Sequence, residues 1–225
     1  MSNQRLVISA GLVLLAAGCL DGVAPAARTA GAPTPHFLRW ASGTPPRFTT
    51  LGSVRGGSNN GHAHLALSSS LSLNRYSASF WAVRGTERSL EIDYQSATGD
   101  TSKPFLRFTT ADPAFVPGVG DLAVGDSVLI TVTIDPERIG VALEPMGLQF
   151  GSPAQLQIWY TGADGDFNGD GVVDQTDAEI ESQFLGVWYQ EGSTDPWAVT
   201  AATHSLADQS FIVSLPHFCE WAVSW

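Results

Sequence analysis

Acidic and amide side chains are concentrated in the twelve residues 166–177. Counted from the first aspartate, side-chain oxygens stand at positions one, three, five, nine and twelve: Asp166, Asn168, Asp170, Asp174 and Asp177. A glycine occupies position six, where the chain must turn sharply, and an apolar residue occupies position eight. Calcium, a hard cation, requires several oxygens that converge on one point. The spacing therefore predicts a calcium-binding loop, to which Val172 would contribute its backbone carbonyl.

The position-eight residue, Val173, is expected to anchor this loop to the core. Starting the pattern at Asp164 would place Gln175 at the closing position, which is a poorer match. An aspartate in place of glutamate at the closing position indicates weaker or less fully bidentate binding, which suits a calcium-rich exterior. The alternative is a solvated Asp/Gly turn without an ion. A catalytic role for these carboxylates is not expected, because their spacing serves one cation.

The loop matches the EF-hand pattern, and the residues after it, 177–186, predict a helix. Ile180 and Phe184 share one face of that helix, and Gly186 suits a helix C-terminus. A calcium loop followed by a single helix, with no helix before it, resembles one repeat of a dockerin. Dockerins carry two repeats and this sequence shows one, so the resemblance implies a calcium site without cohesin binding.

Residues 1–18 predict a signal peptide. A positively charged start leads into the apolar run Leu6–Ala17, which is too short to span a bilayer as a stable helix. The run ends in Leu14-Leu15-Ala16-Ala17-Gly18-Cys19, which resembles a lipobox. The resemblance implies that Cys19 becomes the lipidated first residue and anchors the chain to a membrane. Leu20 then favours the outer membrane of a cell envelope with two membranes. The alternative is an ordinary secretory signal.

Composition favours a folded domain and argues against some partners. The formal net charge is −11, which argues against binding to nucleic acid and suits binding of cations. Hydrophobic residues make up 44% of the chain and charged residues 15%, so the chain can bury a core of its own. After lipidation at Cys19 one cysteine remains, Cys219, so no intramolecular disulfide is expected.

Period-two alternation of apolar and polar residues predicts an all-β antiparallel sandwich, with one short helix after the calcium loop. The clearest predicted strands are residues 90–94, 128–134, 156–160, 211–215 and 219–225. Weaker candidates are residues 47–54, 62–67, 76–83, 105–108, 141–143 and 185–189. Residues 19–40 are predicted to comprise the lipidated cysteine and a flexible tether, because Ala, Pro, Thr and Gly dominate most of this stretch.

Two separated motifs resemble the ZU-five domain, the β-sandwich shared by ankyrins, netrin receptors and zonula occludens proteins. The first is Glu144–Leu156, which contains the proline, glycine, phenylalanine, proline and leucine of the family signature. The second is His217–Val223, which is similar to the closing strand of such domains in bacterial envelope proteins. The resemblance covers residues 104–225 and implies a β-sandwich there. Residues 41–103 fall outside it, as a second small β-domain or as extra strands on the same sandwich.

The second motif raises an alternative function, self-cleavage. Some ZU-five relatives cut themselves between phenylalanine and a following serine, and here Phe218 precedes Cys219, whose thiolate is a good nucleophile. His217 could assist. Cleavage would release only seven residues, with no further domain. Because Cys219 also alternates in phase with Trp221, we expect it to be a buried core residue.

Seven tryptophans raise a third possibility, a carbohydrate-binding module, because exposed rings stack on sugars. Five lie in strand-like runs where burial is expected: Trp81, Trp159, Trp188, Trp221 and Trp225. Trp40 and Trp197 lie near predicted loops and are the better candidates. His62 and His64 could share one face of a strand, but without a third ligand they are interpreted as ordinary strand residues.

Motifs of common enzymes are missing from the sequence: it contains no nucleophile elbow, zinc-protease helix, phosphate-binding glycine loop or cysteine cluster. We therefore expect a protein that is not an enzyme. The sequence predicts a lipid-anchored cell-envelope protein whose calcium-stabilised β-sandwich packs structurally or binds a protein or polysaccharide partner.

Overall fold

The computed structural model describes residues 34–41, 43, 45–55, 69–71, 76–94 and 103–225. They fall within one structural unit, Pro33–Trp225. The predicted signal peptide, Cys19, most of the tether, and the pair His62 and His64 lie outside the described residues.

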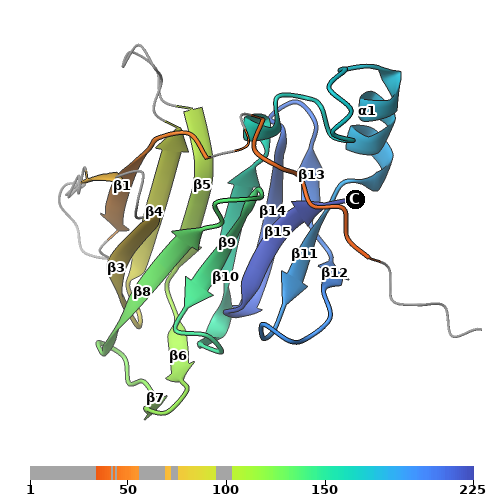
Figure 1. Ribbon diagram of the computed structural model, residues 1–225. Helices are drawn as coiled ribbons and strands as arrows, with labels where there is room; N and C mark the ends of the chain where they lie inside the picture. The colour runs from red at the N-terminus through yellow and green to blue at the C-terminus, as the bar shows by residue number, and fades with distance from the viewer. Residues whose placement is uncertain (1–33, 42, 44, 56–68, 72–75, 95–102) are drawn as a thin grey trace, which may run out of the picture. The chain divides into compact units, whose positions relative to one another are not determined.

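Two antiparallel sheets form a sandwich-like arrangement in the described part of the chain, which confirms the predicted fold class (Figure 1). The larger sheet has the strand order β13-β14-β10-β5-β4-β1-β2, and β6 and β7 extend it beside β10. Its strands are β1 (Phe48–Arg55), β2 (Ser69–Leu71), β4 (Glu87–Tyr94), β5 (Lys103–Thr110), β6 (Pro113–Val116), β7 (Gly120–Asp121), β10 (Gln149–Trp159), β13 (Thr203–Ser205) and β14 (Ser210–His217).

The smaller sheet has the order β12-β11-β15-β9-β8-β3. Its strands are β3 (Ser77–Val83), β8 (Ser127–Ile134), β9 (Gly140–Glu144), β11 (Gly186–Gln190), β12 (Ala198–Thr200) and β15 (Glu220–Ser224). Three short helical segments lie between β10 and β11: η1 (Thr161–Ala163), α1 (Gln175–Glu179) and η2 (Ile180–Phe184).

The core lies between the sheets, because alternate residues of each strand point toward the opposite sheet. In β8, Val128, Ile130, Val132 and Ile134 are buried and the residues between them are more exposed. Phenylalanines from both sheets meet across this layer: the rings of Phe80 on β3 and Phe108 on β5 lie 6.0 Å apart. Each fully buried side chain of this size contributes about 1.5–3 kcal/mol through removal of apolar surface from water.

The predicted strands match the sheets well. Each of them overlaps an observed strand, apart from residues 62–67, which lie outside the described residues. The strands that the pattern did not predict are β2, β6, β7, β12 and β13. They are two to four residues long, which is too short for period-two alternation to be recognised.

Residues 41–103 supply strands to both sheets. In the larger sheet β1 pairs with β4 along its full length, and β4 pairs with β5. In the smaller sheet β3 pairs with β8 from Ser77 to Val83. The sequence left two arrangements open for these residues, a second small β-domain or extra strands on the same sandwich. The observed pairings are those of extra strands on the same sandwich.

Residues 36–40, predicted as the end of a flexible tether, are docked against the smaller sheet. The His36 N–H donates to the Trp225 carbonyl at 3.0 Å, and the Leu38 N–H donates to the Val223 carbonyl at 3.0 Å. Leu38 also accepts from the Ile139 N–H at 2.8 Å. Because the side chains of Leu38 and Trp40 are buried, this segment behaves as a short additional strand. Any tether must therefore end before His36.

The helix after the aspartate loop is shorter and less regular than predicted. Only α1 is α-helical, and η2 continues it as a π-helical turn in which the Leu185 N–H donates to the Ile180 carbonyl at 3.0 Å. Ile180 is buried as predicted, but Phe184 is 61% exposed. The widened turn contains one more residue, so Leu185 takes the buried position that was expected for Phe184.

Candidate metal centre

The aspartate loop lies between β10 and β11, beside α1 (Figure 1). The chain leaves β10 through η1 and reverses at Asp164, which adopts the left-handed conformation with φ of 54°. Aspartate tolerates this conformation better than most residues because its short side chain can bond locally. After this turn the start of the loop packs against the end of β10, where the Phe167 ring lies 5.9 Å from the Tyr160 ring.

The Asp166 carboxylate closes the first half of the loop. Its Oδ1 accepts the Gly169 N–H at 2.8 Å, and its Oδ2 accepts the Gly171 N–H at 2.9 Å. Gly171, the residue at position six of the pattern, has φ of 85°, a conformation that favours glycine. The sharp turn that a calcium loop needs at this position is therefore present in the backbone.

The side chains of Asn168 and Asp170 also accept backbone N–H groups of the loop. The Asn168 Oδ1 accepts the Asp170 N–H at 2.9 Å, and the Asp170 Oδ1 accepts the Val172 N–H at 2.8 Å. Each side chain thus bonds the backbone two residues further on, which is the Asx turn that aspartate and asparagine favour. The Asn168 Nδ2 also donates to the Asp170 Oδ2 at 3.0 Å. These turns curl the backbone around the side chains at positions one, three and five.

Two aspartates start the helix and join the two ends of the loop. Asp174 is the N-cap of α1, and its Oδ1 accepts the Thr176 N–H at 2.7 Å. Asp177 completes a capping box, because its Oδ2 accepts the Asp174 N–H at 2.9 Å. Its Oδ1 accepts the N–H groups of Phe167 at 2.7 Å and Asn168 at 3.2 Å. Asp177 therefore links the start of the loop to its end.

Asp177 is a buried charge, with 1% of its surface exposed. The N–H of Asp174 is the largest influence that lowers the pKa of this carboxyl below its ordinary value, and the N–H groups of Asn168 and Phe167 act in the same direction. Burial opposes them. Since the lowering prevails, the carboxylate stays ionised inside the loop, where an anion is the form that a cation would bind.

The donor set fits calcium by its chemistry. Every predicted ligand offers oxygen, the position-six glycine has the required turn, and the helix begins directly after position nine. Within the described ranges, however, no group of three or more His, Cys, Asp or Glu side chains is arranged to hold a metal ion. The four loop aspartates instead accept backbone N–H groups. The ligand role of the predicted residues stays a prediction.

The loop is anchored by residues other than the one predicted. Val173, expected to anchor it at position eight, is 65% exposed, so that expectation is wrong. Phe167 and Ile180 are buried instead and hold the two ends of the loop.

A buried polar group beneath the helix was not predicted. The Tyr160 hydroxyl donates to the Glu181 Oε1 at 3.0 Å and lies 2.8 Å from the His204 Nε2. Because the hydroxyl has one hydrogen, His204 carries a hydrogen on Nε2 and donates it to Tyr160. Burial raises the pKa of Tyr160, and burial also lowers the pKa of His204. These residues are far apart in the sequence, so their contact left no signal there.

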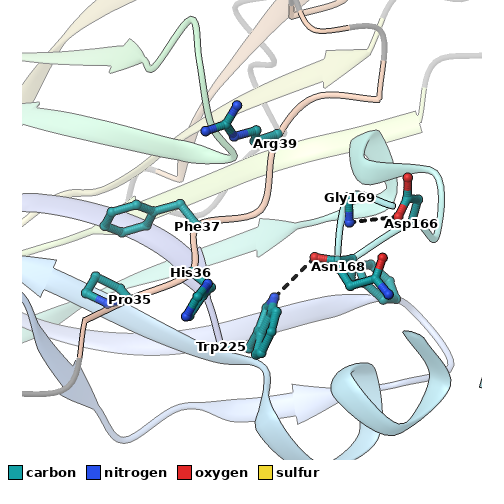
Figure 2. A pocket seen from close by; sticks show the side chains of 9 residues that line it. Pro35, His36, Phe37, Arg39, Asp166, Asn168, Gly169 and Trp225 are labelled. Atoms are coloured by element: carbon teal, nitrogen blue, oxygen red, sulfur yellow. Dashed lines mark hydrogen bonds between the residues drawn. The ribbon is translucent and has the colours of Figure 1, made fainter. Parts of the chain in front are cut away.

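A pocket of about 420 Å³ lies beside the loop (Figure 2). One wall is the docked N-terminal segment and the other is the start of the aspartate loop. Its lining includes Pro35, His36, Phe37, Arg39, Trp225 and residues 166–169. Sequence reasoning missed this pocket because it assigned the first wall to a flexible tether. The pocket includes the predicted calcium ligands Asp166 and Asn168.

For two tryptophans, the observed exposure of the side chain is the reverse of the predicted exposure. Trp40, predicted as an exposed sugar-stacking ring, is 2% exposed, and its Nε1 donates to the Asp135 carbonyl at 3.0 Å. Trp81, predicted to be buried, is 54% exposed. It lies on the outward side of β3, the last strand of its sheet, directly opposite Leu129. Period-two alternation predicts a strand but does not decide which of its faces is covered when both carry large residues.

Cys219 is buried, as predicted. Burial raises the pKa of its thiol to about 12, and the nearby Glu191 acts in the same direction. Thiolate, the nucleophilic form, is therefore scarce at neutral pH. The neighbouring His217 pairs with Glu191, with the Nε2 and Oε1 atoms 3.3 Å apart.

In comparisons with known proteins, no family model, curated protein or solved structure matches this chain. The ZU-five and dockerin resemblances therefore stay predictions. None of the helices in the described residues has the length and apolar character needed to cross a membrane.

Proposed function

We propose that this chain is a lipid-anchored cell-envelope protein whose β-sandwich binds one calcium ion and serves in binding or structural interaction. Cys19 is the proposed attachment to the membrane. The observation that carries the calcium assignment is the backbone of loop 166–177, in which successive Asx turns, the position-six glycine and the capping box match the twelve-residue pattern.

Oxygen atoms from six residues would hold the ion: Asp166, Asn168, Asp170, Val172, Asp174 and Asp177. Bound calcium supplies positive charge that offsets the mutual repulsion of the loop aspartates. Helix α1, which follows the loop, is capped at its start by Asp174 and joined to the core at its end by the buried Ile180. An ordered loop therefore also holds the neighbouring end of the sandwich in place. Calcium is therefore expected to stabilise the folded state.

A role outside catalysis is supported by how the reactive groups are placed. The loop carboxylates accept backbone N–H groups, and Cys219 is a buried thiol with a raised pKa. Self-cleavage between Phe218 and Cys219 requires a thiolate, and burial disfavours that form. Intact mass tests this alternative: a full-length C-terminus argues against cleavage, and loss of the last seven residues would establish it.

Thermal melting in calcium and in chelator tests the metal assignment. Ligand at about a hundred times its Kd stabilises the folded state by about 2.7 kcal/mol, and a protein of this size then melts on the order of 5–10 °C higher. Asp170→Ala should abolish this rise. Asp164→Asn is the matched control, because Asp164 is an aspartate next to the loop that the proposed register leaves unused.

Identical melting temperatures in calcium and chelator would contradict the calcium site. Loss of the rise in Asp164→Asn, with the rise retained in Asp170→Ala, would show that the loop uses the other register. The anchor is tested separately. Metabolic labelling with radioactive palmitate should mark the wild-type chain and leave Cys19→Ala unlabelled, and an unlabelled wild-type chain would contradict lipidation.

Carbohydrate binding is a second candidate function. It is favoured by the exposed indole of Trp81 and by the pocket beside the loop, whose walls combine aromatic and polar side chains. A polysaccharide partner in the envelope would suit both features.

A further inference from the structure

The pocket beside the aspartate loop has two chemically different walls (Figure 2). The docked N-terminal segment supplies Pro35, His36 and Phe37, which are largely apolar surfaces. The loop supplies Asp166 and Asn168, which are polar. Trp225 lies between the two walls.

The aromatic wall is fixed without a ligand. His36 stacks on Trp225, with ring centroids 4.6 Å apart, and the Trp225 Nε1 donates to the Phe167 carbonyl at 3.1 Å. The Phe37 ring lies 4.5 Å from the Arg138 guanidinium carbon and 4.8 Å from the Trp197 ring. A ligand that lies against these rings therefore loses little free energy to ordering them.

The polar groups keep hydrogen-bonding capacity. Each Asp166 oxygen accepts one backbone N–H, and a carboxylate oxygen can accept more than one hydrogen bond. The Asn168 Nδ2 uses one of its two hydrogens on Asp170. Arg39 is exposed at the rim, and no carboxylate of the described residues forms a salt bridge with it. The pocket thus offers acceptors, an amide donor and a bidentate guanidinium donor.

These features together select a class of ligand. A hydrocarbon chain would displace water from Arg39 and Asp166 without offering either of them a hydrogen bond. A phosphate group has no apolar face that could lie against the aromatic rings. A sugar ring has a C–H face for aromatic rings and an edge of hydroxyl groups that both donate and accept.

We propose that this pocket binds a saccharide ring. Its C–H face lies against the aromatic wall, and its edge meets Asp166 and Asn168. Arg39 receives either neighbouring hydroxyls of a neutral sugar or the carboxylate of a uronic acid, since its planar fork suits both. The volume of about 420 Å³ lies within the range of small-molecule sites.

Calcium and saccharide binding are linked, and this part of the proposal rests on the proposed calcium function. Asp166 and Asn168 belong both to the pocket and to the predicted ligand set. A loop ordered by the ion presents these two side chains in one arrangement, so calcium tightens saccharide binding, and by reciprocity the saccharide tightens calcium binding.

Calorimetric titration of the full chain tests the pocket. The probes are tetrasaccharides of glucose, N-acetylglucosamine and galacturonate, each in calcium and in chelator. Arg39→Ala should weaken binding of the recognised probe by about tenfold, because hydrogen bonds from a charged donor are lost. Arg47→Ala is the matched control, since Arg47 is also an exposed arginine in the same part of the chain and does not line the pocket. Trp81→Ala tests the exposed ring on β3.

Binding of one probe that is weakened in Arg39→Ala, and unchanged in Arg47→Ala and Trp81→Ala, supports the pocket. No binding of any probe to the wild-type chain overturns the proposal, as does binding that Trp81→Ala abolishes and Arg39→Ala leaves intact. Equal affinity in calcium and chelator overturns the linkage. The melting experiment distinguishes failure of the calcium site from failure of the saccharide pocket. A calcium-dependent rise in Tm without saccharide binding supports the calcium site and overturns the pocket proposal.

Discussion

The sandwich and the aspartate loop are held together by different interactions. In the sandwich, β5, β10 and β14 pair through backbone ladders, and their alternate side chains fill a dry core. In the loop, the backbone is held mainly by carboxylate and amide oxygens, and Val172 and Val173 point into water. The core is stable through buried apolar area, whereas the loop depends on ionised side chains and so can respond to a cation.

Under the proposed calcium function, this contrast separates the regions whose stability the ion should change from those whose stability it should leave unchanged. The core should be insensitive to the ion, and substitutions within it should lower stability equally with and without calcium. Substitutions in the loop or beneath it should have effects that depend on calcium.

Leu156→Ala removes a fully buried side chain of β10 from the middle of the core. We expect the free energy of unfolding to fall by about 2–5 kcal/mol, because both transfer from water and cavity formation count against the variant. Urea unfolding in calcium and in chelator measures this loss. If the loss differed strongly between the two conditions, the core and the loop would not be separate in the way described.

Tyr160→Phe removes the hydroxyl that joins Glu181 on η2 to His204 on β13. We expect a loss of about 1–3 kcal/mol, because two partly buried polar groups lose their shared partner. The same urea experiment measures it. Tyr189→Phe is a control on the neighbouring sheet, and an equal loss there would mean that the hydroxyl network has no special role.

Asp174→Ala removes the N-cap of α1. In chelator we expect a loss of about 1 kcal/mol, the usual effect of a missing cap. In calcium the loss should be larger, because Asp174 is also a predicted ligand. Urea unfolding in both conditions measures the two losses, and an equal loss in both would argue that Asp174 acts only as a cap.

His204 gives the smallest expected effect, a dependence of stability on pH. Burial lowers the pKa of this imidazole in the folded state, so below pH 6.5 the unfolded chain binds a proton more readily than the folded chain. Stability should therefore be at its full value above pH 6.5 and decrease as the pH falls below it. The slope should flatten in His204→Gln, and an unchanged slope would assign the pH dependence to other groups.

Much of the fold follows from the sequence because alternation records which side of a strand faces the core. Val128 to Ile134 show this directly. Alternation could not show that Leu38 and Trp40 dock as an added strand, because their neighbours in the sequence are typical of a linker. It also could not decide that Trp81 faces water, since that depends on which face of β3 the other sheet covers.

The site divides in the same way. The predicted calcium loop is local in the sequence, so its glycine turn and the helix after it could be anticipated from spacing. The groups around it are not local. Trp225 reaches the loop from the far end of the chain, and His36 and Arg39 come from the opposite end. Their contacts form only in the assembled sandwich, so no sequence motif predicts the pocket.

Calorimetric titration of the wild-type chain with calcium directly tests whether loop 166–177 binds the ion. One ion per chain should bind, binding should disappear in Asp170→Ala, and it should persist in Asp164→Asn. Absence of any heat from the wild-type chain, in a sample shown to be folded, would contradict the calcium loop.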